Sequence, residues 1–215
     1  MRNNFFKVLG LVGLALFLAC TAHADGTTVN MVFTGVNGVN DGHYYVSPYY
    51  GTMNGAPVTL FCDDVLHEVT FGQTWTANVT NLGTAISTGN FSNTRFGSGI
   101  SAANATILYE EVAWLASQFT PTDQSQWVSI QHALWDLTDP AAGYTDVGTW
   151  LSSAELSANY STVNPNDFLI VSDQNLTSAG SVQEFIVRTP EPSSLALLVS
   201  GMLALMLLVI RRGRA

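Results

Sequence analysis

ATILYEEVAWLASQFTPTDQSQWVSIQHALWDL, residues 105–137, carries the helical pattern of a chain that elsewhere alternates like β-strands. Its apolar residues recur three and four positions apart in two runs, 105–119 and 123–137, which predicts two helices. Thr120-Pro121-Thr122-Asp123 lies between them and supplies a capping residue and a proline suited to a first helical turn. A third helix is predicted over 147–158.

The segments on both sides of this helical section are patterned as strands. Residues 28–60 alternate apolar and polar side chains, and Asn54-Gly55 is a strong hairpin signal before a strand that ends at Cys62. Residues 65–79 are predicted as one or two further strands, and 81–100 as a loop rich in Gly, Asn, Ser and Thr. Two more strands are predicted at 168–171 and 182–187.

Strands before and after a helical section are typical of an α+β domain. We therefore predict an antiparallel β-rich sandwich or barrel with an inserted section of about three helices. The domain is expected over residues 25–188, which is long enough for one domain with a sizeable core.

Charge is distributed unevenly along the chain. It has 7 basic and 16 acidic residues, and between residues 25 and 190 the basic ones are Arg95 and Arg188, with no lysine. A surface this acidic is a poor partner for nucleic acid or for an anionic membrane. We therefore expect cations, cationic groups or neutral glycans as ligands, and no nucleic-acid partner.

The N-terminus is patterned as a secretory signal peptide over residues 1–24. Arg2 and Lys7 precede the apolar run 8–19, and Ala22-His23-Ala24 offers a cleavage site. Cys20 raises an alternative, a lipoprotein with a lipid on that cysteine. Cleavage after Ala24 leaves Cys62 as the one cysteine of the exported domain. A single cysteine excludes an internal disulfide and indicates a reactive thiol or an intermolecular bond.

The C-terminus has three parts in a fixed order. Pro190-Glu191-Pro192 is followed by an apolar run that predicts a transmembrane helix over 193–210. A basic tip follows the helix and is expected to stay in the cytoplasm. It contains Arg211, Arg212 and Arg214.

This order of parts, over residues 189–215, resembles the PEP-CTERM sorting signal of Gram-negative bacteria. The resemblance implies that an exosortase recognises and cleaves the signal during export. It also implies an exported protein of the cell envelope, the outer surface or the extracellular matrix, after a transient single-pass stage in the inner membrane. The alternative is an ordinary single-pass anchor.

Two short segments of the domain resemble the motifs of thioester domains in bacterial surface adhesins. They are Phe61-Cys62 and Ile130-Gln131-His132-Ala133-Leu134-Trp135. The second segment matches the hydrophobic-Gln-x-Ala-hydrophobic-Trp motif, whereas Asp63 stands where the family has an apolar residue. The resemblance implies an internal thioester between Cys62 and Gln131.

The chemistry of such a bond suits these residue types. The Cys62 sulfur attacks the side-chain amide carbon of Gln131 and ammonia leaves, with proximity in place of a strong nucleophile. An amine on a target surface then attacks the thioester, which forms an amide with the Gln131 acyl group and frees Cys62. The absence of lysine from the domain removes the internal amines that would consume the bond. Water is expected to be excluded by Phe61, Trp127, Leu134 and Trp135.

Other interpretations of the same residues remain open. Cys62 is also expected as a small buried hydrophobe, with Gln131 bonded to nearby backbone. Cys62, His132 and Asp136 have the residue types of a cysteine hydrolase, although His132 lies about 100° around the helix from Gln131. A metal site would need the carboxylates and the imidazole of one strand to converge, whereas successive side chains of a strand point to opposite faces. Its residues would be Asp63, Asp64, His67 and Glu68.

These observations favour a non-enzymatic protein. We predict an exported adhesin, or a protein associated with biofilm or extracellular polysaccharide, that binds covalently through Cys62 and Gln131. Its partners would be an exosortase, the membrane before processing, and an amine-bearing surface ligand or extracellular polysaccharide. The alternatives are a structural matrix or glycan-binding protein with a buried cysteine, and an extracellular cysteine hydrolase. No cofactor or resident metal is predicted.

Overall fold

The structure, a computed structural model, describes residues 27–145, 147–178 and 180–189. These residues belong to one compact unit. The predicted signal peptide at 1–24 and the sorting signal with its helix, from Pro190 onward, lie outside the described residues. Every helix of the described part is too short or too polar to cross a bilayer.

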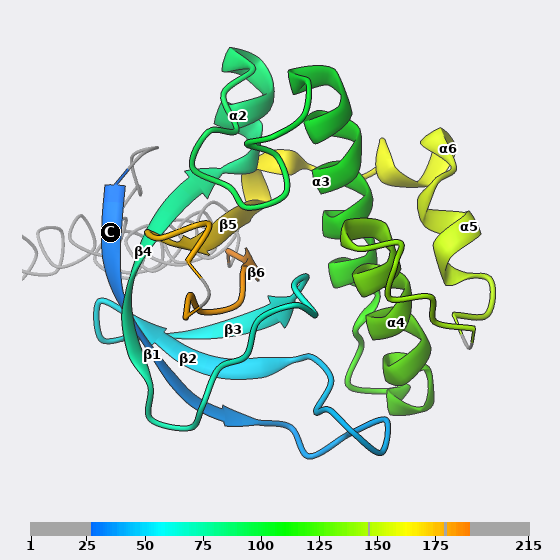
Figure 1. The fold of residues 1–215 in the computed structure, drawn as a ribbon. Coiled ribbons are helices and arrows are strands. Elements are labelled where there is room, and N and C mark those ends of the chain that lie inside the picture. Colours follow the sequence, from blue (N-terminus) through cyan, green and yellow to red (C-terminus); the bar gives the residue numbers. More distant parts are fainter. Residues whose placement is uncertain (1–26, 146, 179, 190–215) are drawn as a thin grey trace, which may run out of the picture. The chain divides into compact units, whose positions relative to one another are not determined.

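Six antiparallel strands close into a barrel in the order β1-β2-β3-β6-β5-β4 (Figure 1). The structure therefore confirms the predicted α+β class, and of the two predicted β architectures it has the barrel. The strands are β1 (Thr27–Val36), β2 (Tyr49–Met53), β3 (Ala56–Cys62), β4 (Thr74–Asn81), β5 (Phe168–Asp173) and β6 (Phe185–Arg188).

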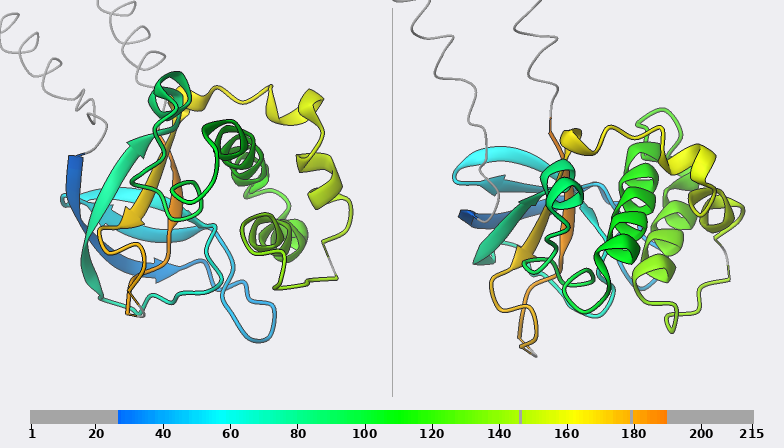
Figure 2. Two further views of the ribbon diagram at one scale, coloured as in Figure 1. Left: turned by 45° about the horizontal axis from the view of Figure 1, so that its top comes forward. Right: turned by 90° about the horizontal axis from the view of Figure 1, so that it is seen from above.

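The helical section is inserted between β4 and β5, and these two strands pair with each other. Asn81 at the end of β4 lies opposite Leu169 at the start of β5, so the chain leaves and re-enters the barrel at one place. The helices and 3-10 turns are α2 (Leu82–Thr88), α3 (Ala102–Gln118), η1 (Gln124–Gln126), α4 (Trp127–Thr138), α5 (Trp150–Ala154), α6 (Ser157–Tyr160) and η2 (Pro165–Asp167). Helices α3 and α4 lie side by side between the barrel and the α5–α6 pair (Figure 2).

Three predicted elements differ from the structure. The loop predicted over 81–100 contains α2, which Asn81 caps by accepting from the Thr84 N–H and Gly89 ends at a φ of 68°. The strand predicted from residue 65 begins only at Thr74, because residues 65–73 form a loop that ends in a turn at Gly72. The prediction of about three helices is too low for the described residues.

The helices around Pro121 and Leu156 also differ from prediction. Asp123 caps a 3-10 turn by accepting from the Ser125 N–H. The second predicted helix, α4, therefore starts at Trp127 and not at Asp123. The third predicted helix, 147–158, is two short helices. Leu156 adopts an extended ψ of 118° between them, which interrupts the helical hydrogen bonds.

Two hydrophobic cores divide the domain. One fills the barrel with alternate residues of its strands, among them Val29, Met31 and Phe33 of β1. The other joins α3 and α4 to the outer face of the barrel. Strand β5 is buried along its whole length because it borders both cores. Successive side chains of β3 point to opposite faces of the sheet. Phe61 therefore packs in the helix–barrel core and Cys62 inside the barrel.

We predict that Gly51→Ala destabilises the domain by about 1–3 kcal/mol, because the added methyl group overpacks the barrel. A Cβ on Gly51 would lie 2.8 Å from the Val32 carbonyl oxygen and 3.0 Å from Leu60 Cδ1. Gly99→Ala is the control, because its Cβ meets nothing within 4 Å. Urea denaturation measures both changes, and equal midpoints for the two variants would contradict this account of the barrel.

Candidate functional site

The ladder between β2 and β3 is interrupted next to Cys62. Tyr49 and Leu60 are paired, and continuing the register would place Ser47 opposite Cys62. Instead, the Cys62 N–H donates to the Ser47 side-chain hydroxyl at 2.8 Å. The backbone groups that would have completed the ladder, the Ser47 N–H and the Cys62 carbonyl, are therefore open to another partner.

That partner is the side-chain amide of Gln131 on α4. Its Oε1 accepts from the Ser47 N–H at 2.9 Å, and its Nε2 donates to the Cys62 carbonyl at 2.6 Å. The amide thus occupies the place of a peptide group between two backbone strands. Cys62, Gln131 and Ser47 are completely buried. The structure therefore brings together the two residues of the predicted thioester, 69 positions apart in sequence, with Cys62 and Gln131 carrying their unreacted thiol and amide.

Helix α4 positions the amide through its two faces. Ile130 and Leu134 lie in the helix–barrel core and fix the height and rotation of the helix. Gln131 and Trp135, one turn apart, share a neighbouring face that points to the end of β3. Trp135 belongs to the barrel-interior core, although it comes from a helix outside the barrel.

The Cys62 thiol has a donor and an acceptor beside it. The Trp135 indole Nε1–H donates to the sulfur at 3.5 Å, and the thiol donates to the Asp64 carbonyl at 3.3 Å. Burial raises the pKa of Cys62 well above its ordinary value, and the Trp135 hydrogen bond opposes this effect only in part. The resting group is therefore a thiol and not a thiolate, so any reaction with Gln131 depends on proximity.

The four predicted shelter residues lie in two places. Trp135 contacts the sulfur itself. Phe61, Trp127 and Leu134 belong to the helix–barrel core, on the other side of β3 from the thiol. They exclude water from the back of the site, whereas Trp135 bonds the Cys62 sulfur directly.

The predicted hydrolase residues point to other partners. His132 contacts Asp41 through Nε2 at 2.9 Å and stacks on Tyr144 with ring centroids 4.0 Å apart. The Asp136 carboxylate accepts from the Tyr144 N–H at 3.1 Å. The hydrogen bonds of the Cys62 thiol go instead to the Asp64 carbonyl and the Trp135 indole.

Two of the four residues considered for a metal group, Asp64 and His67, contact Arg95 and each other instead. Asp64 contacts Arg95 Nε at 2.9 Å and His67 Nδ1 at 3.0 Å. Arg95 Nη1 lies 3.2 Å from His67 Nε2, which assigns His67 as a neutral acceptor at Nε2 and a donor at Nδ1. Glu68 is exposed and lies outside this network. Over the described ranges, no three His, Cys, Asp or Glu side chains are placed to hold a metal ion.

Sequence reasoning missed Glu184, a carboxylate buried beside this network. It accepts from the Tyr109 hydroxyl at 2.6 Å and the Arg95 N–H at 2.6 Å, and also from the Ser172 hydroxyl. Asp63, also completely buried, receives no hydrogen bond from the described residues at either carboxylate oxygen. Burial, followed by the charges of Glu184 and Asp64, raises the pKa of Asp63 well above its ordinary value. The raised pKa favours the neutral form of this buried side chain.

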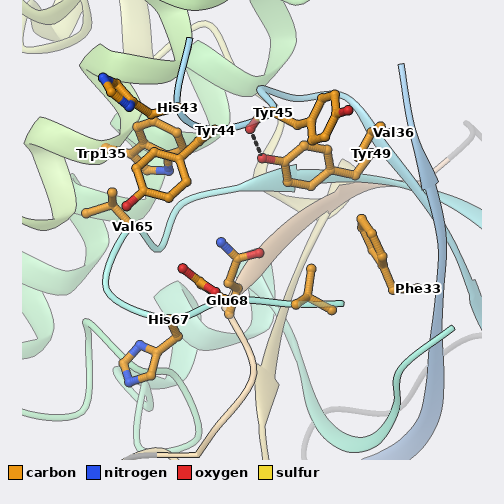
Figure 3. Close-up of a pocket in the computed structure, with 12 residues that line it drawn as sticks. Phe33, Val36, His43, Tyr44, Tyr45, Tyr49, Val65, His67, Glu68 and Trp135 are labelled. Carbon is orange, nitrogen blue, oxygen red and sulfur yellow. Dashed lines mark hydrogen bonds between the residues drawn. The ribbon is translucent and has the colours of Figure 1, made fainter. Parts of the chain in front are cut away.

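A pocket of about 290 Å³ opens at the barrel mouth beside Trp135 (Figure 3). Tyr44 packs edge-on against Trp135 with ring centroids 6.1 Å apart, and Glu68 lies between these rings and His67. No signal in the sequence marked this pocket, because its walls come from five separate segments. It is lined by Phe33, Val36, His43, Tyr44, Tyr45, Tyr49, Val65, His67, Glu68, Val69, Trp135 and Gln183.

Comparison with known proteins adds no relative to this picture. No family model, no curated protein and no solved structure matches the chain.

We predict that Asp63→Asn makes the domain more stable relative to the natural protein as pH rises. Because the folded state raises the pKa of Asp63, its contribution is fully present below the ordinary carboxyl pKa and is lost as pH rises through the folded value. Asparagine has the same shape and no proton to lose.

Urea denaturation at about pH 5 and about pH 8 measures this difference, with Asp139→Asn at a partly exposed turn as the control. A stability difference between Asp63→Asn and the natural protein that does not change with pH would contradict a neutral Asp63.

Proposed function

We propose that this protein is an exported surface or matrix protein that binds its target covalently through a thioester between Cys62 and Gln131. The observation that carries the proposal is the insertion of the Gln131 amide between the Ser47 N–H and the Cys62 carbonyl. A structural glutamine needs only a partner for each of its polar atoms. This one bonds the backbone of the cysteine itself, and both residues are completely buried.

The reaction follows from the groups in place. The Cys62 sulfur bonds to the Gln131 side-chain carbon, the bond from that carbon to Nε2 breaks, and Nε2 leaves as ammonia with the thiol proton. The Ser47 N–H donates to Oε1, where negative charge develops in the tetrahedral intermediate. The same hydrogen bond polarises the acyl carbon of the finished thioester toward an incoming amine.

Burial supports both the formation and the persistence of the bond. Inside the barrel the thioester is shielded from water by Trp135 on one side and by the helix–barrel core on the other. The domain itself offers no competing amine, because it contains no lysine. These properties suit a binding protein that reacts once and not an enzyme that turns over.

Export and processing are the second part of the proposal. They are supported by the order of Pro190-Glu191-Pro192, the apolar run and the arginine tip, and by the signal-peptide pattern at the N-terminus. The protein would be cut by an exosortase near the triplet and would act in adhesion, biofilm or extracellular polysaccharide.

We predict that the intact exported protein weighs less than its sequence by the mass of one ammonia molecule, and that Gln131→Glu abolishes this deficit. A carboxylate has no ammonia to lose and is a poor acyl donor to a thiol. Mass spectrometry measures the deficit under native conditions. Gln126→Glu, the same change at an exposed position before α4, is the control that keeps the deficit.

The full sequence mass for the natural protein, with Cys62 open to alkylation, would remove the thioester from the proposal. It would leave the interpretation of Cys62 as a buried structural residue.

We predict that the C-terminus of the protein isolated from its own host lies near Pro190, because the sorting signal is removed there. Peptide mapping by mass spectrometry locates the terminus. A triple substitution of Pro190, Glu191 and Pro192 by alanine is expected to leave the arginine tip attached. Recovery of the natural protein with Arg214 still present would contradict processing.

A further inference from the structure

We propose that the aromatic pocket beside Trp135 is the receptor for the attacking group, and that it selects a primary alkylammonium such as a lysine side chain. For the chemical step alone, this inference depends on the thioester proposed above. The recognition step stands on the pocket by itself.

Two residues that line the pocket also contact the surroundings of the Cys62 thiol. Trp135 lines it and also donates to the Cys62 sulfur. Gln183 lines it and also donates to the Asp64 carbonyl at 3.2 Å, the same carbonyl that accepts from the thiol. A ligand in the pocket is therefore separated from the thiol by the Trp135 indole.

Cys62 and Gln131 have no exposed surface, so an amine reaches them only when the groups that cover them move. On the pocket side, Tyr44 packs edge-on against Trp135, is 46% exposed and lies in a loop. His132 and Tyr144 also pack against the Trp135 indole, so a ligand that displaces Tyr44 loosens the indole without freeing it. Binding in the pocket is thus linked to opening of the site through Tyr44 and Trp135.

The chemistry of the walls favours a cation. Tyr44, Tyr45 and Trp135 present aromatic rings, whose faces attract an ammonium group. Glu68 lies between them and His67, and it has no cationic partner within salt-bridge distance in the described part of the chain. No lysine or arginine lines the pocket.

The other titratable groups at the pocket do not oppose a cation. His67 uses both ring nitrogens, one toward Asp64 and the other toward Arg95, and is assigned as neutral. His43 is exposed at the rim. Glu68 is therefore the charged side chain that the pocket offers, and an alkylammonium complements it while its methylene groups cover the rings.

The covalent step balances with the groups named. The amine nitrogen bonds to the Gln131 acyl carbon, and the bond from that carbon to the Cys62 sulfur breaks. An alkylammonium loses two protons in becoming an amide, one to solvent through the pocket and one to the departing thiolate. The products are an amide at Gln131 and the free Cys62 thiol.

Binding is tested without chemistry in the Cys62→Ser form of the exported protein. The serine hydroxyl keeps a donor for the Asp64 carbonyl and an acceptor for Trp135. Calorimetry compares pentylamine, an ammonium at neutral pH, with pentan-1-ol of similar shape. We expect the amine to bind more tightly than the alcohol.

Two substitutions test which residues of the pocket bind the ammonium group. Glu68→Gln is expected to weaken pentylamine binding about fivefold and to leave pentanol binding unchanged. Tyr44→Leu, which keeps apolar area and removes the ring, is expected to weaken it by a similar factor of about five. Glu155→Gln removes the same charge at an exposed position away from the pocket and is the matched control.

Equal affinity for the two probes, or no effect of Glu68→Gln, would overturn the pocket's role. Binding of a neutral glucose oligomer in place of the amine would overturn it as well, and would make the pocket a glycan site.

Covalent capture separates this inference from the proposed function. The natural protein is incubated with pentylamine, and the mass of the adduct is followed over time. Capture that Glu68→Gln slows about fivefold supports both proposals. Capture at an unchanged rate in Glu68→Gln overturns the pocket and leaves the thioester, whereas binding without any capture leaves the pocket and overturns the thioester.

Discussion

The insertion of one side-chain amide into a backbone ladder is the constraint on which the site depends. Ser47 and Cys62 leave one N–H and one carbonyl unpaired inside a dry core, where an unpaired backbone group is costly. The Gln131 amide fits both, which fixes the rotation of α4 against the barrel. The same two hydrogen bonds hold the Gln131 side chain against the backbone of Cys62, which is the contact that the proposed chemistry uses.

The barrel and the helices contribute different groups to this contact. The barrel supplies a rigid wall, because β3 is paired on both sides and Cys62 points into a packed interior. The helical layer supplies the two side chains that contact Cys62 from outside the barrel, since α4 carries both Gln131 and Trp135. The closed site has one weakly covered side, at Tyr44 and Trp135. That side faces an aromatic pocket with an unpaired carboxylate, where an approaching amine would be recognised.

Three carboxyl groups are buried beside the site. Asp64 and Glu184 share Arg95 among their partners, and burial raises the pKa of Asp63 well above its ordinary value. Sequence reasoning treated Asp63, Asp64, His67 and Glu68 as a candidate metal group because they are close in sequence. The fold separates them, with Asp63 and Asp64 buried and Glu68 exposed in the pocket. Glu184 escaped notice because its partners come from distant segments.

The sequence by itself determined the class of the fold and the pair worth testing. Alternation along β1, the hairpin at Asn54-Gly55 and the helical spacing within 105–137 are local patterns, so they can be read without contacts. The break in the helix at Leu156 and the short helix α2 were not predicted. Local capping and backbone conformation decide these segments, and composition does not show either. Only the tertiary structure decided that the sheet closes into a barrel and that Ser47 lies beside Cys62. It also decided that the Trp135 side chain, on α4, packs in the barrel core. These features depend on strand register and long-range packing, and no short stretch of sequence encodes either.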